Sequence, residues 1–182
     1  MADGKILGSW SGMRKYLEKD MLAPSLQSRV RYGCTRFVGM DGCHIFEICV
    51  DGQPVKRFSW ETVNSYFIHQ GYAPKEKPGS IPDYWEGFWT LLGRYPLSER
   101  TEYTDKEFCD ALTAYRGQDI QSSLFSSHPI VSMFALLDRR VGRGLLSKYA
   151  EGLSARPTWL RSFYELRIRA EESRKDEAAC AL

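Results

Sequence analysis

The sequence predicts an α+β fold in which an N-terminal helix and a three-stranded antiparallel meander precede a helical C-terminal half. Two Asp-Gly pairs, at 41–42 and 51–52, separate three short segments rich in β-branched and aromatic residues. Because glycine accepts a positive φ without steric cost, Asp-Gly is a strong hairpin signal. After residue 83, apolar residues recur instead at helical spacing. The predicted single domain, 1–182, divides into an α/β-meander part (1–71), a helical part (83–172) and a flexible tail (173–182).

The meander part begins with a short helix in WSGMRKYLEKDML, where Ser11 is the expected N-cap. The strands are expected over 29–38, 44–50 and 54–58. An antiparallel meander of this size needs a helix on one face to become stable. That helix is expected to begin after Ser59 and to stop at Gly71. Its buried stripe consists of Trp60, Val63, Phe67 and Ile68.

The helical part contains several amphipathic segments and one segment that is apolar almost all round. Thr104 and Gly117 are the expected cap and stop of the helix in TDKEFCDALTAYRG. HPIVSMFALLDRRVG, with Pro129 in its first turn, should form the central, most buried helix. In DYWEGFWTLLGRY the expected buried face consists of Tyr84, Trp85, Phe88, Trp89 and Leu92. The last helix should present Trp159, Phe163, Leu166 and Ala170 on one face.

Composition and charge argue against several classes of partner. The net charge of +2 is too small to indicate nucleic acid as the main partner. No stretch approaches the roughly 20 apolar residues that a membrane helix needs. Five cysteines without a CxxC pair favour a reducing, cytoplasmic location over a disulfide framework.

No motif indicates a metal site, a cofactor or a catalytic residue. Cys34, Cys43, His44 and Cys49 suggest a metal cluster at first. His44, however, neighbours Cys43 on a strand and must point to the opposite face, which a tetrahedral site cannot easily use. Buried structural cysteines are the better interpretation. The sequence also lacks a nucleophile elbow, a phosphate-binding glycine loop and an HExxH motif.

LDRRVGRG, at 137–144, is the one candidate binding motif. The structural interpretation makes Gly142 the stop of the apolar helix and places Arg139 and Arg140 in its last turn. Both should then be partly buried, while Arg143 is more exposed. The functional alternative is an anion site, because Arg139, Arg140 and Arg143 around a glycine turn could hold phosphate or carboxylate. We favour the structural interpretation and keep the alternative open.

Four blocks carry a resemblance to a known family: WSGMRKYLE (10–18), LQSRVRY (26–32), HPIVSMFALLDRRVGRG (128–144) and PTWLRSFYELRIRAE (157–171). With these blocks the chain resembles an uncharacterised family of small bacterial proteins marked by LDRRVG. The resemblance implies a bacterial cytoplasmic protein and carries over no activity or ligand.

The expected function is a non-enzymatic cytoplasmic binding or protein-interaction module. The motivation is an abundance of core-forming residues without a convergent titratable motif. The alternative is an enzyme or sensor that binds a phosphorylated or carboxylated small molecule through Arg139, Arg140 and Arg143.

Overall fold

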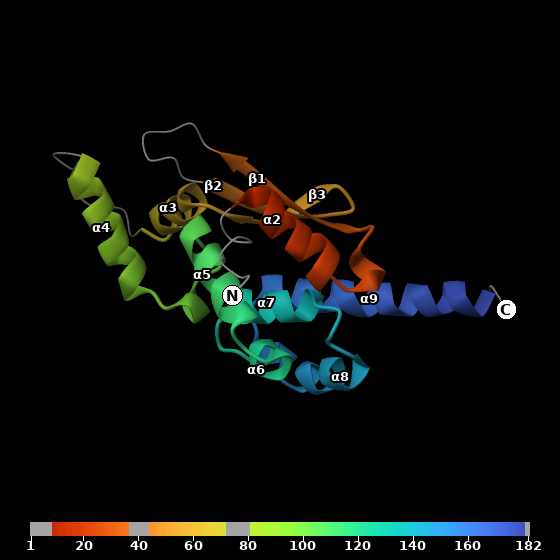
Figure 1. The fold of residues 1–182 in the computed structure, drawn as a ribbon. Helices are drawn as coiled ribbons and strands as arrows, with labels where there is room; N and C mark the ends of the chain where they lie inside the picture. The colour runs from red at the N-terminus through yellow and green to blue at the C-terminus, as the bar shows by residue number, and fades with distance from the viewer. Residues whose placement is uncertain (1–8, 37–43, 72–80, 181–182) are drawn as a thin grey trace.

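A computed structural model describes residues 9–36, 44–71 and 81–180. It confirms the predicted α+β architecture, with a helical N-terminal segment, three antiparallel strands and a helical C-terminal half (Figure 1). The first half contains α2 (Trp10–Lys15), η1 (Tyr16–Met21), η2 (Pro24–Leu26), β1 (Val30–Arg36), β2 (His44–Val50), β3 (Gln53–Phe58) and α3 (Trp60–His69). The second half contains α4 (Ile81–Arg94), η3 (Leu97–Glu99), α5 (Asp105–Arg116), α6 (Ile120–Leu124), α7 (Pro129–Leu137), α8 (Arg143–Glu151), η4 (Leu153–Ala155) and α9 (Thr158–Cys180).

The sheet has the order β1-β2-β3, and both strand pairs are antiparallel. Asp51 (φ 50°) and Gly52 (φ 81°) form the turn between β2 and β3, which confirms the hairpin predicted there. The Asp41-Gly42 pair lies outside the described residues. In β3 the register slips: Lys56 pairs with Ile48, whereas Pro54 pairs with Cys49. Val55 is therefore the extra residue of a β-bulge.

The main core lies between the sheet and the C-terminal helices. Figure 1 shows the sheet above a layer that contains α7 and α9, with α6 and α8 below that layer. Every residue of α7 is buried, as the sequence predicts for its central helix. Phe134 of this helix packs on Phe108 and Tyr115 of α5, with ring centroids 5.2 and 5.6 Å apart.

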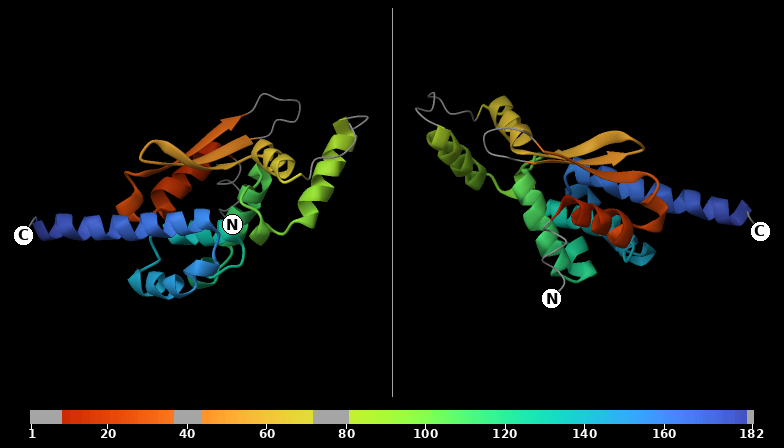
Figure 2. Two further views of the ribbon diagram at one scale, coloured as in Figure 1. Left: turned by 180° about the vertical axis from the view of Figure 1, so that it is seen from behind. Right: turned by 45° about the horizontal axis from the view of Figure 1, so that its top comes forward.

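A second, smaller apolar cluster joins α3 to α4. Its fully buried members are Val63, Phe67 and Phe88, and partly buried aromatic side chains surround them. Ser59 caps α3 and Gly71 follows its end with φ 75°, as predicted. Two predictions for this region are wrong: Ile68 is 51% exposed and Trp89 is 45% exposed. Figure 2 shows α4 at the end of the molecule opposite the C-terminus.

The N-terminal helix differs from the prediction in its cap and its winding. Ser9, not Ser11, accepts the hydrogen bond from the N–H of Gly12. After Lys15 the chain continues as a π-helix, η1, whose Glu18 side chain is buried. A Glu18 carboxylate oxygen accepts a 2.9 Å hydrogen bond from the N–H of Tyr32 in β1. The π-helix thereby covers part of the outer edge of the sheet.

The C-terminal helix also extends further than the sequence indicates. α9 continues to Cys180, whereas the sequence predicts a flexible tail from residue 173. In Figures 1 and 2 its last turns project beyond the body of the molecule.

Candidate functional site

The LDRRVG segment does not end the apolar helix in the predicted way. α7 stops at Leu137, because Asp138 adopts an extended backbone with ψ 140°. Gly142 is the N-cap of α8 rather than the stop of α7. Arg139 and Arg140 therefore lie in the connection between two helices. The backbone of this connection pairs with the N-terminal segment, where the N–H of Arg139 donates to the carbonyl of Met21 at 2.8 Å.

Asp138 organises this connection. Its side chain is 1% exposed and accepts from the Tyr115 hydroxyl and, at 2.6 Å, from the backbone N–H of Arg140. Arg140 also donates to it from Nε and Nη2, at 3.1 and 2.9 Å. Arg140 thus forms an ion pair with a buried carboxylate, although 52% of this arginine side chain remains exposed. Burial, together with the bond to Asp138, raises the pKa of Tyr115.

The three arginines of the predicted anion site have different surroundings. Arg140 faces Asp138 and Tyr115. The prediction that Arg139 is partly buried is wrong: it lies in the connection outside α7, is exposed, and its side chain has no hydrogen bond or ion pair within the described ranges. Arg143 is exposed on α8 and lines a hollow between α8 and α9 that also contains Glu171. Anion binding by the three arginines together stays a prediction.

An apolar groove lies where the β2–β3 hairpin overhangs α9. It has a volume of about 390 Å³ and is lined by Val50, Val55, Trp159, Ser162, Phe163 and Leu166. The last four residues are spaced i, i+3, i+4 and i+7 along α9 and therefore share one face. The opposite wall carries Val55, the extra residue of the bulge in β3, whose side chain is 50% exposed. The groove thus has apolar walls on both sides, and Val55 is its most exposed apolar side chain.

A buried lysine lies beside this groove. Lys56, with its side chain 5% exposed, follows Val55 and donates to the carbonyl of Thr101 at 2.5 Å and to Glu102 at 3.1 Å. The ammonium lies 5.3 Å from the ring centroids of both Tyr103 and Trp159. Aromatic faces attract a desolvated cation. Burial lowers the pKa of Lys56, and the neighbouring Glu102 partly opposes this effect.

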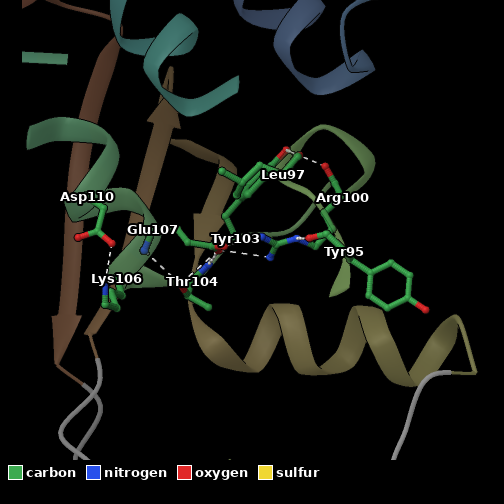
Figure 3. Close-up of polar contacts among 8 residues, drawn as sticks. All are labelled: Tyr95, Leu97, Arg100, Tyr103, Thr104, Lys106, Glu107 and Asp110. Atoms are coloured by element: carbon green, nitrogen blue, oxygen red, sulfur yellow. Dashed lines mark hydrogen bonds and ion pairs between the residues drawn. The ribbon is translucent and has the colours of Figure 1, made fainter. Parts of the chain in front are cut away.

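A buried arginine, Arg100, directly precedes the partners of Lys56 in the sequence, and Figure 3 shows its contacts. Arg100 is 3% exposed, donates to the carbonyl of Tyr95 at 3.1 Å and forms an ion pair with Glu107. The Tyr103 hydroxyl donates to the carbonyl of Arg100 at 2.6 Å. Thr104 and Glu107 form a capping box at the start of α5, which confirms Thr104 as the cap. These bonds fix both ends of the segment that carries Thr101 and Glu102.

The sequence interpretation missed Lys56 and Val55, although one signal for them was available. Side chains alternate along a strand, so Lys56 must share a face with Phe58, two residues on. Phe58 is a core residue by type and is 0% exposed. A lysine on the core side, next to an outward valine, inverts the usual pattern of an edge strand. This inverted pattern is the sequence signal that could have identified Lys56 and Val55 as unusual positions.

Neither a metal-binding cluster nor a membrane-spanning helix is found among the described residues. Cys34 Sγ lies 3.9 Å from His44 Nδ1, but within the described ranges no three His, Cys, Asp or Glu side chains are arranged to hold a metal ion. In the same ranges no helix is both long and apolar enough to cross a membrane.

Comparison with known proteins identifies the family. The model of the SF0329 protein family matches residues 9–168. The chain belongs to the SF0329 protein family. The matched span includes all six residues that line the groove and the whole Leu137–Gly144 connection. No curated protein and no solved structure matches the chain.

Proposed function

We propose that this protein is a non-enzymatic binding module whose hairpin groove takes apolar side chains of a partner protein. The observation that carries the proposal is a groove with two apolar walls: half-exposed Val55 on the hairpin, and partly buried Trp159 and Leu166 on α9. A hollow of about 390 Å³ lies in the size range of small-ligand and side-chain pockets. Apolar and aromatic anchors that enter such pockets supply most of the binding energy at protein interfaces.

The polar group beside the groove favours binding over catalysis. A lysine acts as a nucleophile or base only when its amine can become free. Lys56 is instead held by the carbonyl of Thr101 and the carboxylate of Glu102, and aromatic rings lie against its ammonium. We therefore assign Lys56 a structural role, in which it joins β3 to the segment before α5.

The edge of β3 favours inserted side chains over an added strand. Proline has no backbone N–H, and a bulge disturbs the ladder that a new strand would need. Pro54 directly precedes Val55, which is the bulge residue and lines the groove, so β3 has both features there. A helix or loop that inserts apolar side chains between Val55 and α9 fits this arrangement best.

The test is site-specific photo-crosslinking in the native cell. Benzoylphenylalanine replaces Val55 in one variant and Ile68 in a matched control, because these side chains are equally exposed, at 50 and 51%. We expect one protein, identified by mass spectrometry, to crosslink at position 55 and not at position 68. With that protein purified, calorimetry should show binding at least about tenfold weaker for Val55→Asp and nearly unchanged for Ile68→Asp.

Three results would contradict the proposal. Equal crosslinking at both positions would indicate general apolar adhesion. Crosslinks only between copies of this chain would assign the groove to self-association. Native mass spectrometry showing a small apolar molecule, lost in Val55→Asp, would make the groove a ligand pocket.

We further propose that this binding takes place in a bacterial cytoplasm. Among the described residues Cys34, Cys49 and Cys109 are free thiols, which supports a reducing compartment.

A further inference from the structure

A second surface, on the N-terminal helix, carries more exposed positive than negative charge, although Asp20 at its end is an exposed carboxylate. A hollow of about 250 Å³ lies there, lined by Trp10, Ser11, Arg14, Lys15, Glu18 and Lys19. The side chains of Arg14, Lys15 and Lys19 are exposed, and within the described residues none of them forms an ion pair. Their charges therefore act outward on the solvent.

The spacing of these residues along α2 and η1 places Lys15 and Lys19 on one side of the helix. Ser11 and Lys15 are four residues apart in α2, and Lys15 and Lys19 are four apart where η1 begins. Residues at this spacing lie on one side of the helix. Like charges on neighbouring turns of a helix repel one another at a small cost in stability. An anionic partner would remove that repulsion.

The carboxylate in the hollow is directed inward. Glu18 accepts from the N–H of Tyr32 at 2.9 Å, and its side chain is only 11% exposed. Arg31 approaches the same carboxylate at 3.9 Å and adds a further cation at the border of the hollow. The outward side of the hollow is therefore dominated by guanidinium and ammonium groups.

We propose that this α2–η1 surface binds an acidic segment of a partner protein, rich in aspartate or glutamate. Charge complementarity selects the partner, because carboxylates match closely spaced Arg and Lys side chains. Ser11 adds a hydroxyl donor and Trp10 an aromatic side chain at the end of the hollow. A protein segment fits better than a nucleic acid duplex, whose phosphates extend over a longer footprint than two short helices offer. This surface is independent of the hairpin groove.

The test uses a fluorescein-labelled peptide of ten glutamates and fluorescence anisotropy at low salt. The triple variant Arg14→Gln, Lys15→Gln, Lys19→Gln removes the cations of the hollow. Its matched control, Arg94→Gln, Lys148→Gln, Arg174→Gln, removes the same charge from exposed positions on α4, α8 and α9. We expect binding to weaken about tenfold or more in the first variant and less than about threefold in the control. Val55→Asp should bind the peptide as the native protein does.

Three results would overturn the proposal. Failure of the native protein to bind the peptide at low salt would remove the site. Equal weakening by both triple variants would show that only overall charge matters. Displacement of the peptide by duplex DNA that binds more tightly would assign the surface to nucleic acid instead.

Discussion

The two apolar clusters of this protein differ in how completely they exclude water. In the main core, α7 is buried along its whole length between other elements. In the cluster that joins α3 to α4, three side chains are fully buried among the residues that the structure describes, and Ile68 and Trp89 on the same two helices are about half exposed. Hydrophobic stabilisation grows with the apolar area removed from water. The main core should therefore set global stability, while the α3–α4 cluster opens at a lower free energy.

Truncation of one phenylalanine in each cluster should show this difference most clearly. Phe134→Ala leaves a cavity among Phe108, Tyr115 and the rest of the core, at an expected cost of about 3–5 kcal/mol in the free energy of unfolding. Phe88→Ala should cost less, because its surroundings can collapse or become hydrated. Denaturant unfolding measures the first effect. Hydrogen exchange should show faster exchange in α3 and α4 alone for Phe88→Ala, and faster exchange in α7 as well would contradict the comparison.

The next effect concerns the end of the central helix. Arg140→Ala leaves the Asp138 carboxylate, 1% exposed, with fewer partners. The expected loss is about 1–3 kcal/mol, because a buried charge that loses its partner keeps its desolvation cost. Arg94→Ala, in the exposed last turn of α4, is the control and should change stability by less than about 0.5 kcal/mol. Chemical unfolding at pH 7 measures both changes. A loss for Arg140→Ala as small as that for the control would mean that the Asp138 carboxylate does not need Arg140 as a partner.

The fold could be predicted largely because its strongest signals are local. The turn at Asp51-Gly52, the cap at Thr104 and the all-apolar α7 each depend on residues within a few positions of one another. The sheet order followed from the hairpin turns, since short connections join neighbouring antiparallel strands. Local signals failed where two were equivalent: Ser9 and Ser11 can both cap a helix, and the structure uses Ser9.

The candidate site could not be predicted in the same way, because distant segments create it. The end of α7 at Leu137 depends on Tyr115, 23 residues before Asp138, and on the pairing of Arg139 with Met21. Lys56 is held by Thr101, 45 residues away. Neither partner can be chosen from a single sequence, since many hydroxyl and carbonyl groups are chemically equivalent. What the sequence could show was the unusual lysine on the core side of β3.

Acidification should destabilise the main core more than the α3–α4 cluster, because His128 is partly buried at the start of α7. Burial lowers the pKa of His128, the N-cap of α7, although Glu107 and Asp110 oppose this effect. The folded protein therefore holds His128 neutral where the unfolded chain, with a pKa of about 6.5, takes up a proton. The stability that His128 contributes is present above that pH and is lost as pH falls below it.

The measurement compares unfolding midpoints at pH 7 and pH 5. His128→Gln should reduce the loss on acidification, whereas His69→Gln on α3 should leave it unchanged, because that side chain is exposed. A native-sized acid loss in His128→Gln would assign the sensitivity to other groups.

The smallest expected effect on the free energy of unfolding is that of Arg143→Ala, at the surface next to the connection between α7 and α8. Arg143 lies three residues after Arg140 but beyond Gly142, in the first turn of α8, where its side chain is exposed. No ion pair or hydrogen bond of this side chain occurs in the part of the chain that the structure describes. Arg143→Ala should therefore change the free energy of unfolding by less than about 0.5 kcal/mol, as surface substitutions usually do. A loss as large as that of Arg140→Ala would place the whole Leu137–Gly144 connection in the buried architecture. A near-neutral result leaves Arg143 available to bind an anion, and phosphate titration of the native protein and of Arg143→Ala would then test that role directly.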